Sequence, residues 1–187
     1  MQTVMYPTAG YIPDLAKNSE PGQISIEEIR YLRSLAKKVA DIAANPKQEL
    51  KRDLWYRHNR MENVRPMLLV FPEDSWIDVI KEDALEINDP FWRQWEWYLK
   101  HLIYRDEKLA DDFVIEPDLY VSAVLSISDW GMKAKYTRLD PKGSYIWDPP
   151  LKNYGDIKKL RYPVLDIDEN ASQKRLEAVG EVFSDIL

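Results

Sequence analysis

An unbroken apolar segment, Met67–Phe71, follows Pro66 in the sequence RPMLLVF. Proline is tolerated at the first residue of a strand, where its missing backbone donor removes no ladder hydrogen bond. The segment does not alternate between apolar and polar residues, which is typical of a strand with both faces covered, as in a parallel sheet. A second segment of this kind, Phe113–Val121, lies in DDFVIEPDLYV. The sequence therefore predicts two buried strands whose faces the rest of the chain has to cover.

Helices are predicted on both sides of these segments. SIEE at Ser25–Glu28 is a capping box, and apolar residues recur at helical spacing after it. Asn45 and Asp89 each precede a proline, so each is expected to begin another helix, and Asp168 begins the last one. The third helix carries FWRQWEWY, Phe91–Tyr98. The spacing of its aromatic residues favours a role in the core and in an interface over a ligand-binding aromatic cage.

Strands that alternate with helices of this length predict an α/β protein with a parallel sheet. A β-hairpin is expected at about 132–147, because DPKG supplies turn residues between KAKY and SYIW. Two parallel strands alone make a poor core, so the sheet is expected to be incomplete in this chain. The predicted organisation is an extended arm over 1–24, a helical extension over 25–62 and a sheet-containing domain over 63–187.

The net charge and the composition limit the kinds of partner and binding site that this chain is expected to have. The net charge is −6, and basic residues are interspersed with acidic ones, so nucleic acid is not expected as a partner. The absence of cysteine excludes disulfides, thiolate zinc sites and a cysteine nucleophile. The sequence MQTVMYPTAGYIPDL lacks the features of a secretory signal, and no apolar run reaches the roughly 20 residues of a membrane helix. A cytoplasmic protein without a membrane partner is expected.

Three stretches together resemble a known family: LWYRHNRMENVRPMLLV, DDFVIEPDLYV and GSYIWDPPLKNYGDIKKLRYP. They are similar to the amino-terminal part of uroporphyrinogen decarboxylase-like proteins, in particular to an uncharacterised branch related to corrinoid-dependent methyltransferases. WYRHN before RPM and YIWDPPL before KKLRYP are distinctive in combination. The resemblance covers roughly residues 25–187 and less than half of such a family protein. It implies the first βα units of a TIM-type (β/α)8 barrel, with the site at the carboxyl ends of the strands.

The resemblance also implies candidate site residues. In the decarboxylases, an acidic residue at the end of the second strand binds the pyrrole nitrogens, and Asp118 occupies the position that resembles it. Glu116 shares a strand face with Asp118, so both are candidate catalytic residues for proton transfer or for binding a cationic ligand. The alternative for this pair is a solvated turn. Glu73, Asp74 and Trp76 follow the first strand and are candidate substrate-binding residues.

Trp130, after the second strand, is a further substrate-binding candidate, with packing under the hairpin as the alternative. The decarboxylases hold the porphyrinogen carboxylates with arginines just after the first strand, whereas FPEDSWID has three acidic residues there and no arginine. Decarboxylation of uroporphyrinogen itself is therefore not expected. The methyltransferase relatives use a zinc site of His and Cys on later strands. No cofactor or metal is expected to bind this chain alone, and a corrinoid is implied through the resemblance only.

The leading functional hypothesis is the amino-terminal portion or a subunit of a uroporphyrinogen decarboxylase-like protein. Its activity would be corrinoid-linked methyl transfer on a small methylated substrate, and the chain would not be catalytic by itself. Self-association or a second chain would complete the barrel, and a corrinoid protein would be a partner. The alternative is a non-catalytic interaction or oligomerisation module that uses the aromatic-rich helix faces. An enzyme portion should leave Glu116 and Asp118 in a cleft, whereas an interaction module should bury them or leave them on a flat surface.

Overall fold

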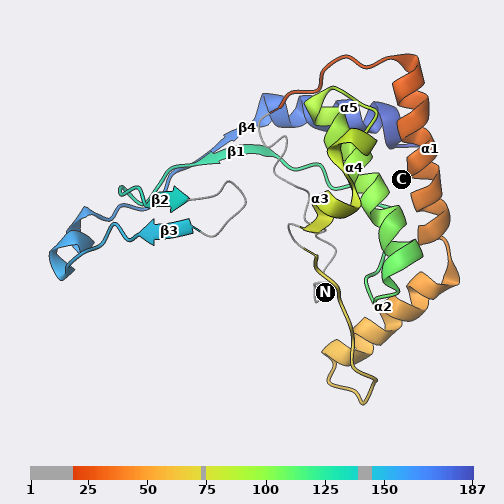
Figure 1. Ribbon diagram of the computed structural model, residues 1–187, viewed down its shortest axis with the longest axis horizontal. Helices are drawn as coiled ribbons and strands as arrows, with labels where there is room; N and C mark the ends of the chain where they lie inside the picture. Colours follow the sequence, from red (N-terminus) through yellow and green to blue (C-terminus); the bar gives the residue numbers. More distant parts are fainter. Residues whose placement is uncertain (1–18, 73–74, 139–144) are drawn as a thin grey trace. The chain divides into compact units, whose positions relative to one another are not determined.

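The computed structural model describes residues 19–72, 75–138 and 145–187, which form two compact units (Figure 1). Of the described residues, those within 19–122 and 173–187 make up the helical unit, and those within 123–172 make up the strand unit. Helices and short strands make the protein mixed α/β, as predicted. Within the described residues, every helix is too short or too polar to span a lipid bilayer.

The helical unit contains most of the helices. They are α1 (Ile26–Ala43), α2 (Pro46–Asn59), α3 (Trp76–Val79), α4 (Pro90–Tyr104) and most of α5 (Glu169–Phe183). The predicted capping box is confirmed, because the Ser25 hydroxyl accepts from the Glu28 N–H at 3.1 Å and the Glu28 carboxylate accepts from the Ser25 N–H at 2.7 Å. The side chains of Asn45 and Asp89 cap α2 and α4 in the predicted way.

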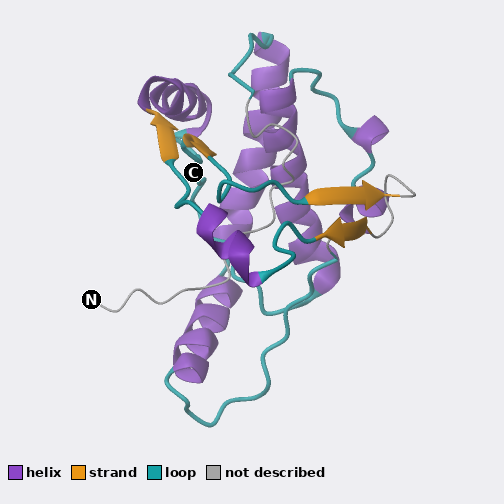
Figure 2. Ribbon diagram, turned by 90° about the vertical axis from the view of Figure 1, so that its left-hand side faces the viewer, coloured by secondary structure: helices purple, strands orange, loops and turns teal. Residues whose placement is uncertain are grey.

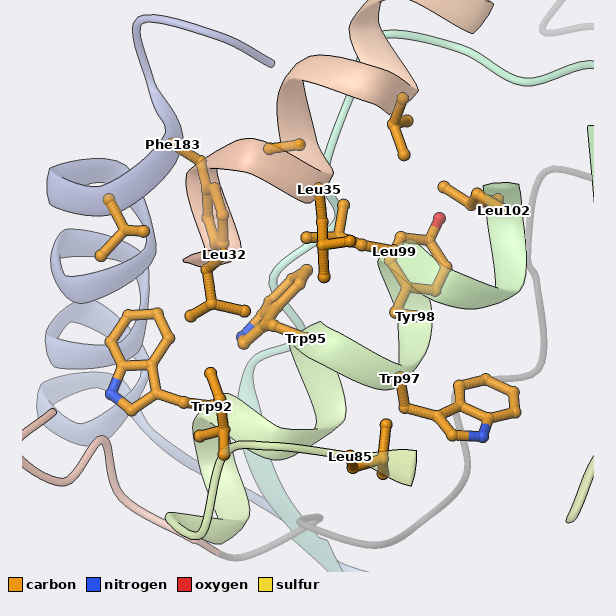
Figure 3. Close-up of a cluster of buried hydrophobic side chains, with 14 of the residues drawn as sticks. Leu32, Leu35, Leu85, Trp92, Trp95, Trp97, Tyr98, Leu99, Leu102 and Phe183 are labelled. Atoms are coloured by element: carbon orange, nitrogen blue, oxygen red, sulfur yellow. The ribbon is translucent and has the colours of Figure 1, made fainter. Parts of the chain in front are cut away.

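The core of this unit is built around α4, which lies beside α1 (Figure 1). Figure 3 shows Trp95 of α4 close to leucines of α1 and on the same side as the ring of Phe183 from α5. The Phe183 ring centroid lies 6.1 Å from that of Trp95 and 6.5 Å from that of Trp92. The prediction that FWRQWEWY contributes to the core is therefore confirmed.

The strands predicted over 67–71 and 113–121 are not formed, although both segments are described, and the first segment is bonded to the two residues that directly precede the second. The Asp112 N–H donates to the Leu68 carbonyl at 2.8 Å, and the Leu68 N–H donates to the Asp112 carboxylate at 2.8 Å. The Asp111 carboxylate accepts from the Val70 N–H at 3.1 Å. The carboxylates of Asp111 and Asp112 thus accept hydrogen bonds from backbone N–H groups that would otherwise pair with a neighbouring strand. Apolar patterning predicted buried strands, but a strand also needs backbone partners.

The strand unit consists of two antiparallel pairs, β1 (Val124–Ile127) with β4 (Leu165–Asp168), and β2 (Lys135–Arg138) with β3 (Tyr145–Asp148). The second pair is the predicted hairpin, and its DPKG turn lies outside the described residues. A 3-10 helix also belongs to the unit, and Figure 2 shows how short the strands are beside the helices. The parallel sheet predicted from residues 67–71 and 113–121 is not formed, and the antiparallel β1–β4 pair was not predicted.

One face of the β1–β4 pair is apolar and exposed to solvent. The register pairs Leu125 with Ile167 and Ile127 with Leu165, so these four side chains share a face, and all four are exposed. Contiguous exposed apolar side chains are characteristic of surfaces that bind other proteins.

Candidate functional site

A small pocket lies where the extended segment after Asp112 passes helix α4. Its volume is about 10 Å³, enough for a single water molecule. The lining comes from α4 and from the following segment: Tyr98, Leu102, Phe113, Val114, Ile115, Glu116, Asp118 and Tyr120. Both carboxylates that the sequence put forward as catalytic therefore border the same pocket.

Helix α2 holds the segment that forms one wall of this pocket. The Gln48 side-chain oxygen accepts from the Ile115 N–H at 3.0 Å, and the Lys51 ammonium donates to the Phe113 carbonyl at 3.1 Å. The Trp55 indole N–H donates to the Asp112 carbonyl at 2.7 Å. These side chains satisfy buried backbone groups that would otherwise need a strand partner. They explain how the segment keeps its extended form without a sheet.

Glu116 is held in a bidentate ion pair. Arg52 of α2 donates to its two carboxylate oxygens at 2.9 Å and 2.5 Å. Bidentate pairs of this kind fix both partners in position and occupy the carboxylate's acceptor sites. The geometry suits Glu116 to anchoring α2 against the pocket wall rather than to accepting a proton from a substrate.

Asp118 is exposed and borders the pocket beside two tyrosines. Burial is the main cause that raises the pKa of Tyr98 to about 12, with smaller contributions from Tyr120 and Asp118. Tyr98 is therefore protonated at neutral pH. The pocket thus combines a phenol that can donate a hydrogen bond with a carboxylate that can accept one.

The segment that leads into the pocket is fixed by a buried ion pair. Arg105 and Asp111 are both buried, and their charged groups lie 2.6 Å apart. Arg105 also donates to the Val70 carbonyl at 2.7 Å, and its guanidinium carbon lies 4.2 Å from the centroid of the Phe113 ring. Burial lowers the pKa of Arg105, while Asp111 acts in the opposite direction. Ala110, with φ of 43°, makes the left-handed turn between the two partners.

The other candidates are not among the residues that line this pocket, or they lie outside the described residues. Trp76 begins α3 and is buried with its ring at the edge of His101, at a centroid distance of 4.4 Å. Trp130 belongs to the strand unit, is exposed and has its ring centroid 6.3 Å from that of Tyr162. Glu73 and Asp74 lie outside the described residues. Trp76 has a packing role, and it does not line the pocket.

Sequence reasoning missed three residues that shape the pocket: Arg52, Tyr98 and Tyr120. Tyr98 belongs to FWRQWEWY, which the sequence predicts to contribute to the core. Helical spacing alone does not show which of these buried side chains also lines a pocket. Tyr120 follows Asp118 by two residues, which is a signal that could have placed it near the carboxylate. Arg52 lies 64 positions before Glu116, so no local pattern links the two.

His101 is buried among aromatic rings and titrates far from its ordinary range. Its ring stacks on Trp97 with an interplanar angle of 7° and a centroid distance of 5.2 Å. None of the described residues hydrogen-bonds its Nδ1 atom, which is buried. Burial lowers the pKa of His101 to about 4, and the positive charge of Arg105 contributes to this shift.

Acidification should therefore destabilise the helical unit through His101. The pKa is about 4 in the folded chain, against an ordinary value of 6.5. Between these values the unfolded chain binds a proton that the folded chain does not, so the free energy of unfolding should fall by up to about 3 kcal/mol as the pH drops from 6.5 to 4. Urea denaturation at a series of pH values measures this loss. His101→Phe should remove this part of the pH dependence and His58→Phe should keep it, and an unchanged pH profile in His101→Phe would contradict the assignment.

Among residues 19–72, 75–138 and 145–187, no group of three or more His, Asp and Glu side chains is arranged to hold a metal ion. Comparison with protein-family models, with curated proteins and with solved structures finds no match to this chain. The charged and polar groups at the pocket are Asp118, the phenols of Tyr98 and Tyr120, and Glu116, which Arg52 holds.

Proposed function

We propose that this chain is the amino-terminal portion or a subunit of a uroporphyrinogen decarboxylase-like protein that takes part in corrinoid-linked methyl transfer on a small methylated substrate. The chain supplies the first strands of a TIM-type barrel and is not catalytic alone. A second copy or another chain supplies further strands, a corrinoid protein delivers or receives the methyl group, and the assembly is cytoplasmic. The observation that carries the proposal is the bonding of Leu68 and Val70 to Asp112 and Asp111, which directly precede the segment that lines the carboxylate pocket.

The exposed side chains of the first segment support the need for further strands. Leu68 is 60% exposed and Phe71 is 52% exposed, in a segment that is almost entirely apolar. A barrel strand has both faces covered, one by the barrel interior and one by helices. Added strands would bury these side chains and would bring backbone partners to the two segments, which would then become regular strands.

The location of the pocket supports a substrate-binding role for Asp118. Barrel enzymes carry their sites at the carboxyl ends of the strands, and Glu116 and Asp118 lie within the second segment and line its pocket. In the proposed site Asp118 contacts the substrate and Glu116 is held by Arg52. Glu73, Asp74 and Trp130 stay candidates for substrate contacts, whereas Trp76 packs in the core.

A second function, that of a non-catalytic interaction module, is favoured by the apolar face of β1 and β4. The side chains of Leu125, Ile127, Leu165 and Ile167 are exposed on one face of that pair. A surface of this kind fits an oligomerisation partner and needs no pocket. The two functions therefore use different surfaces of the chain, and single substitutions can separate them.

The first test is light scattering coupled to size-exclusion chromatography, together with hydrogen exchange at residues 67–71 and 113–121. The barrel proposal expects an oligomer in which these amides exchange slowly. Leu68→Asp should then yield monomers, while Leu50→Asp, at an equally exposed site on α2, should leave the mass unchanged. Loss of association in Ile127→Asp but not in Leu68→Asp would favour the interaction module. A compact monomer with fast exchange in both segments would contradict the barrel.

The second test measures methyl transfer by the assembly isolated from cells that produce it. Formation of methylcobalamin from cob(I)alamin and a small methylated substrate is followed by absorbance. Asp118→Ala should lower the rate by about 10²-fold, the scale of losing one positioned carboxylate. Asp53→Ala, an exposed carboxylate on α2, should leave the rate unchanged. An unaltered rate in Asp118→Ala would remove Asp118 from the site, and the absence of transfer would contradict the function.

A further inference from the structure

The basic residues of the strand unit are concentrated in one stretch, residues 130–162. This stretch contains eight Lys and Arg residues and three Asp residues, a net charge of +5 in a chain whose net charge is −6. Asp148 and Asp156 form ion pairs with Lys152 and Lys159. The excess positive charge fits an anionic partner, and it opposes docking of the same stretch from a second copy. Four other basic side chains are exposed and form no ion pair with a described residue: Lys133, Lys135, Lys158 and Arg161.

The β2–β3 pair presents three aromatic rings on one face. The register pairs Tyr136 with Trp147, and Tyr145 lies two residues before Trp147, so the three side chains share a face. Each is more than half exposed, and the ring centroids of Tyr136 and Tyr145 lie 5.1 Å apart with the rings edge-on. Modules that bind single-stranded RNA stack two or three unpaired bases on aromatic residues of a sheet face. The β2–β3 face has the composition and the exposure that such stacking needs.

A second exposed aromatic pair lies at the ends of the same stretch. The Arg161 N–H donates to the Trp130 carbonyl at 2.9 Å, and the ring centroids of Trp130 and Tyr162 lie 6.3 Å apart. Gly131, with φ of 81°, makes the turn, and a Cβ atom there would lie 3.3 Å from Cγ of Arg161. The stem of the Arg161 side chain therefore lies against the residue that follows Trp130. The turn holds a cationic side chain beside two exposed rings.

We propose that the described residues of 130–162 bind single-stranded nucleic acid without reading its sequence. The exposed rings stack on bases, and the lysine and arginine side chains contact phosphates. A polynucleotide supplies planar partners for the rings and anions for the cations together, whereas an acidic protein surface supplies the anions alone. A duplex fits less well, because its bases already stack on one another. The acidic remainder of the chain opposes binding weakly, since exposed charges are screened beyond about 8–10 Å at physiological ionic strength.

The test is fluorescence anisotropy of labelled oligo(dT) and oligo(U) of about 20 nucleotides, longer than the sites of single-stranded binding folds. The full chain should bind both, and it should bind oligo(dT) annealed to oligo(dA) at least about tenfold more weakly. Four phosphate contacts, one for each unpaired basic side chain, predict that log affinity falls with log salt concentration with a slope of about −3 between about 50 and 200 mM salt.

Variants separate the rings from the cations. Trp147→Leu should weaken binding by about tenfold, the scale of losing one base–aromatic stack, and Trp147→Phe should keep most of the affinity. Lys158→Gln combined with Arg161→Gln should make the salt slope shallower by about 1.4, the value for two phosphate contacts. Lys37→Gln combined with Lys38→Gln removes two exposed cations from α1 and should leave affinity and slope unchanged.

Several results would overturn the inference. They are equal binding of the single strand and the duplex, equal affinity in Trp147→Leu, and an equal loss in the Lys37 and Lys38 variant. Binding to phosphatidylserine vesicles without binding to either oligonucleotide would assign the stretch to a lipid surface instead, and no binding to any of these probes would leave an acidic protein as the anionic partner. The inference does not rest on the proposed function, and no methyl-transfer assay enters the test, so each can fail alone.

Discussion

Asp111→Ala should lower the free energy of unfolding of the helical unit by about 3–5 kcal/mol, the scale of removing one partner from a buried ion pair. The variant leaves the guanidinium of Arg105 buried without its counter-charge, because both side chains are almost completely enclosed. It also removes the acceptor of the Val70 N–H, which lies 3.1 Å from the carboxylate. Urea denaturation followed by far-UV circular dichroism, which reports mainly on the helices, measures the change.

Two variants test whether the loss comes from the unpaired charge. The double variant Arg105→Met, Asp111→Leu replaces the pair by apolar side chains and should recover most of the stability, because burying two charges is itself costly. Asp53→Ala breaks an exposed pair with Arg57 on α2 and should change the stability little. Similar losses in Asp111→Ala and in the double variant would show that volume or backbone contacts, and not charge, determine the effect.

Phe183→Ala should lower the free energy of unfolding by about 3–5 kcal/mol, the usual cost of truncating a buried phenylalanine. The ring is 1% exposed and packs against Trp92 and Trp95 of α4. Its removal leaves a cavity at the point where α5 meets the aromatic face of α4. The same urea denaturation measures the effect.

The control for Phe183→Ala lies on the same helix. Leu176 is exposed, so Leu176→Ala should change the stability by no more than about 0.5 kcal/mol. An equally small effect of Phe183→Ala would mean that α5 is not part of the helical core, and the assignment of residues 173–187 to that unit would fail.

The features that sequence predicted correctly are those encoded by neighbouring residues. Ser25, Asn45 and Asp89 mark helix starts because a cap needs a side chain and a backbone donor two or three residues away. The hairpin of β2 and β3 follows from the turn residues that DPKG supplies between its two arms. In each case the residues next to the feature were sufficient to predict it.

The features that sequence did not predict depend on partners distant in the chain. Residues 67–71 have the composition of a strand, but their donors meet the carboxylates of Asp111 and Asp112. Arg52 and Glu116 are 64 positions apart, and nothing in the sequence near either residue identifies the other. The candidate pair of Glu116 and Asp118 was found because both lie in one short segment. Tyr98, which faces them from α4, was not found.

The position of α5 affects how the chain folds during synthesis. Residues 1–122 leave the ribosome before the strand unit, yet the core that they form also needs Phe183 from the end of α5. Translation at about 5–20 residues per second separates the two events by roughly 3–10 s, the time needed to make residues 123–172. Throughout that interval the tryptophan face of α4 is without its final cover. Chaperones that recognise aromatic surface would therefore be expected to engage nascent chains of intermediate length and to release them once α5 has emerged.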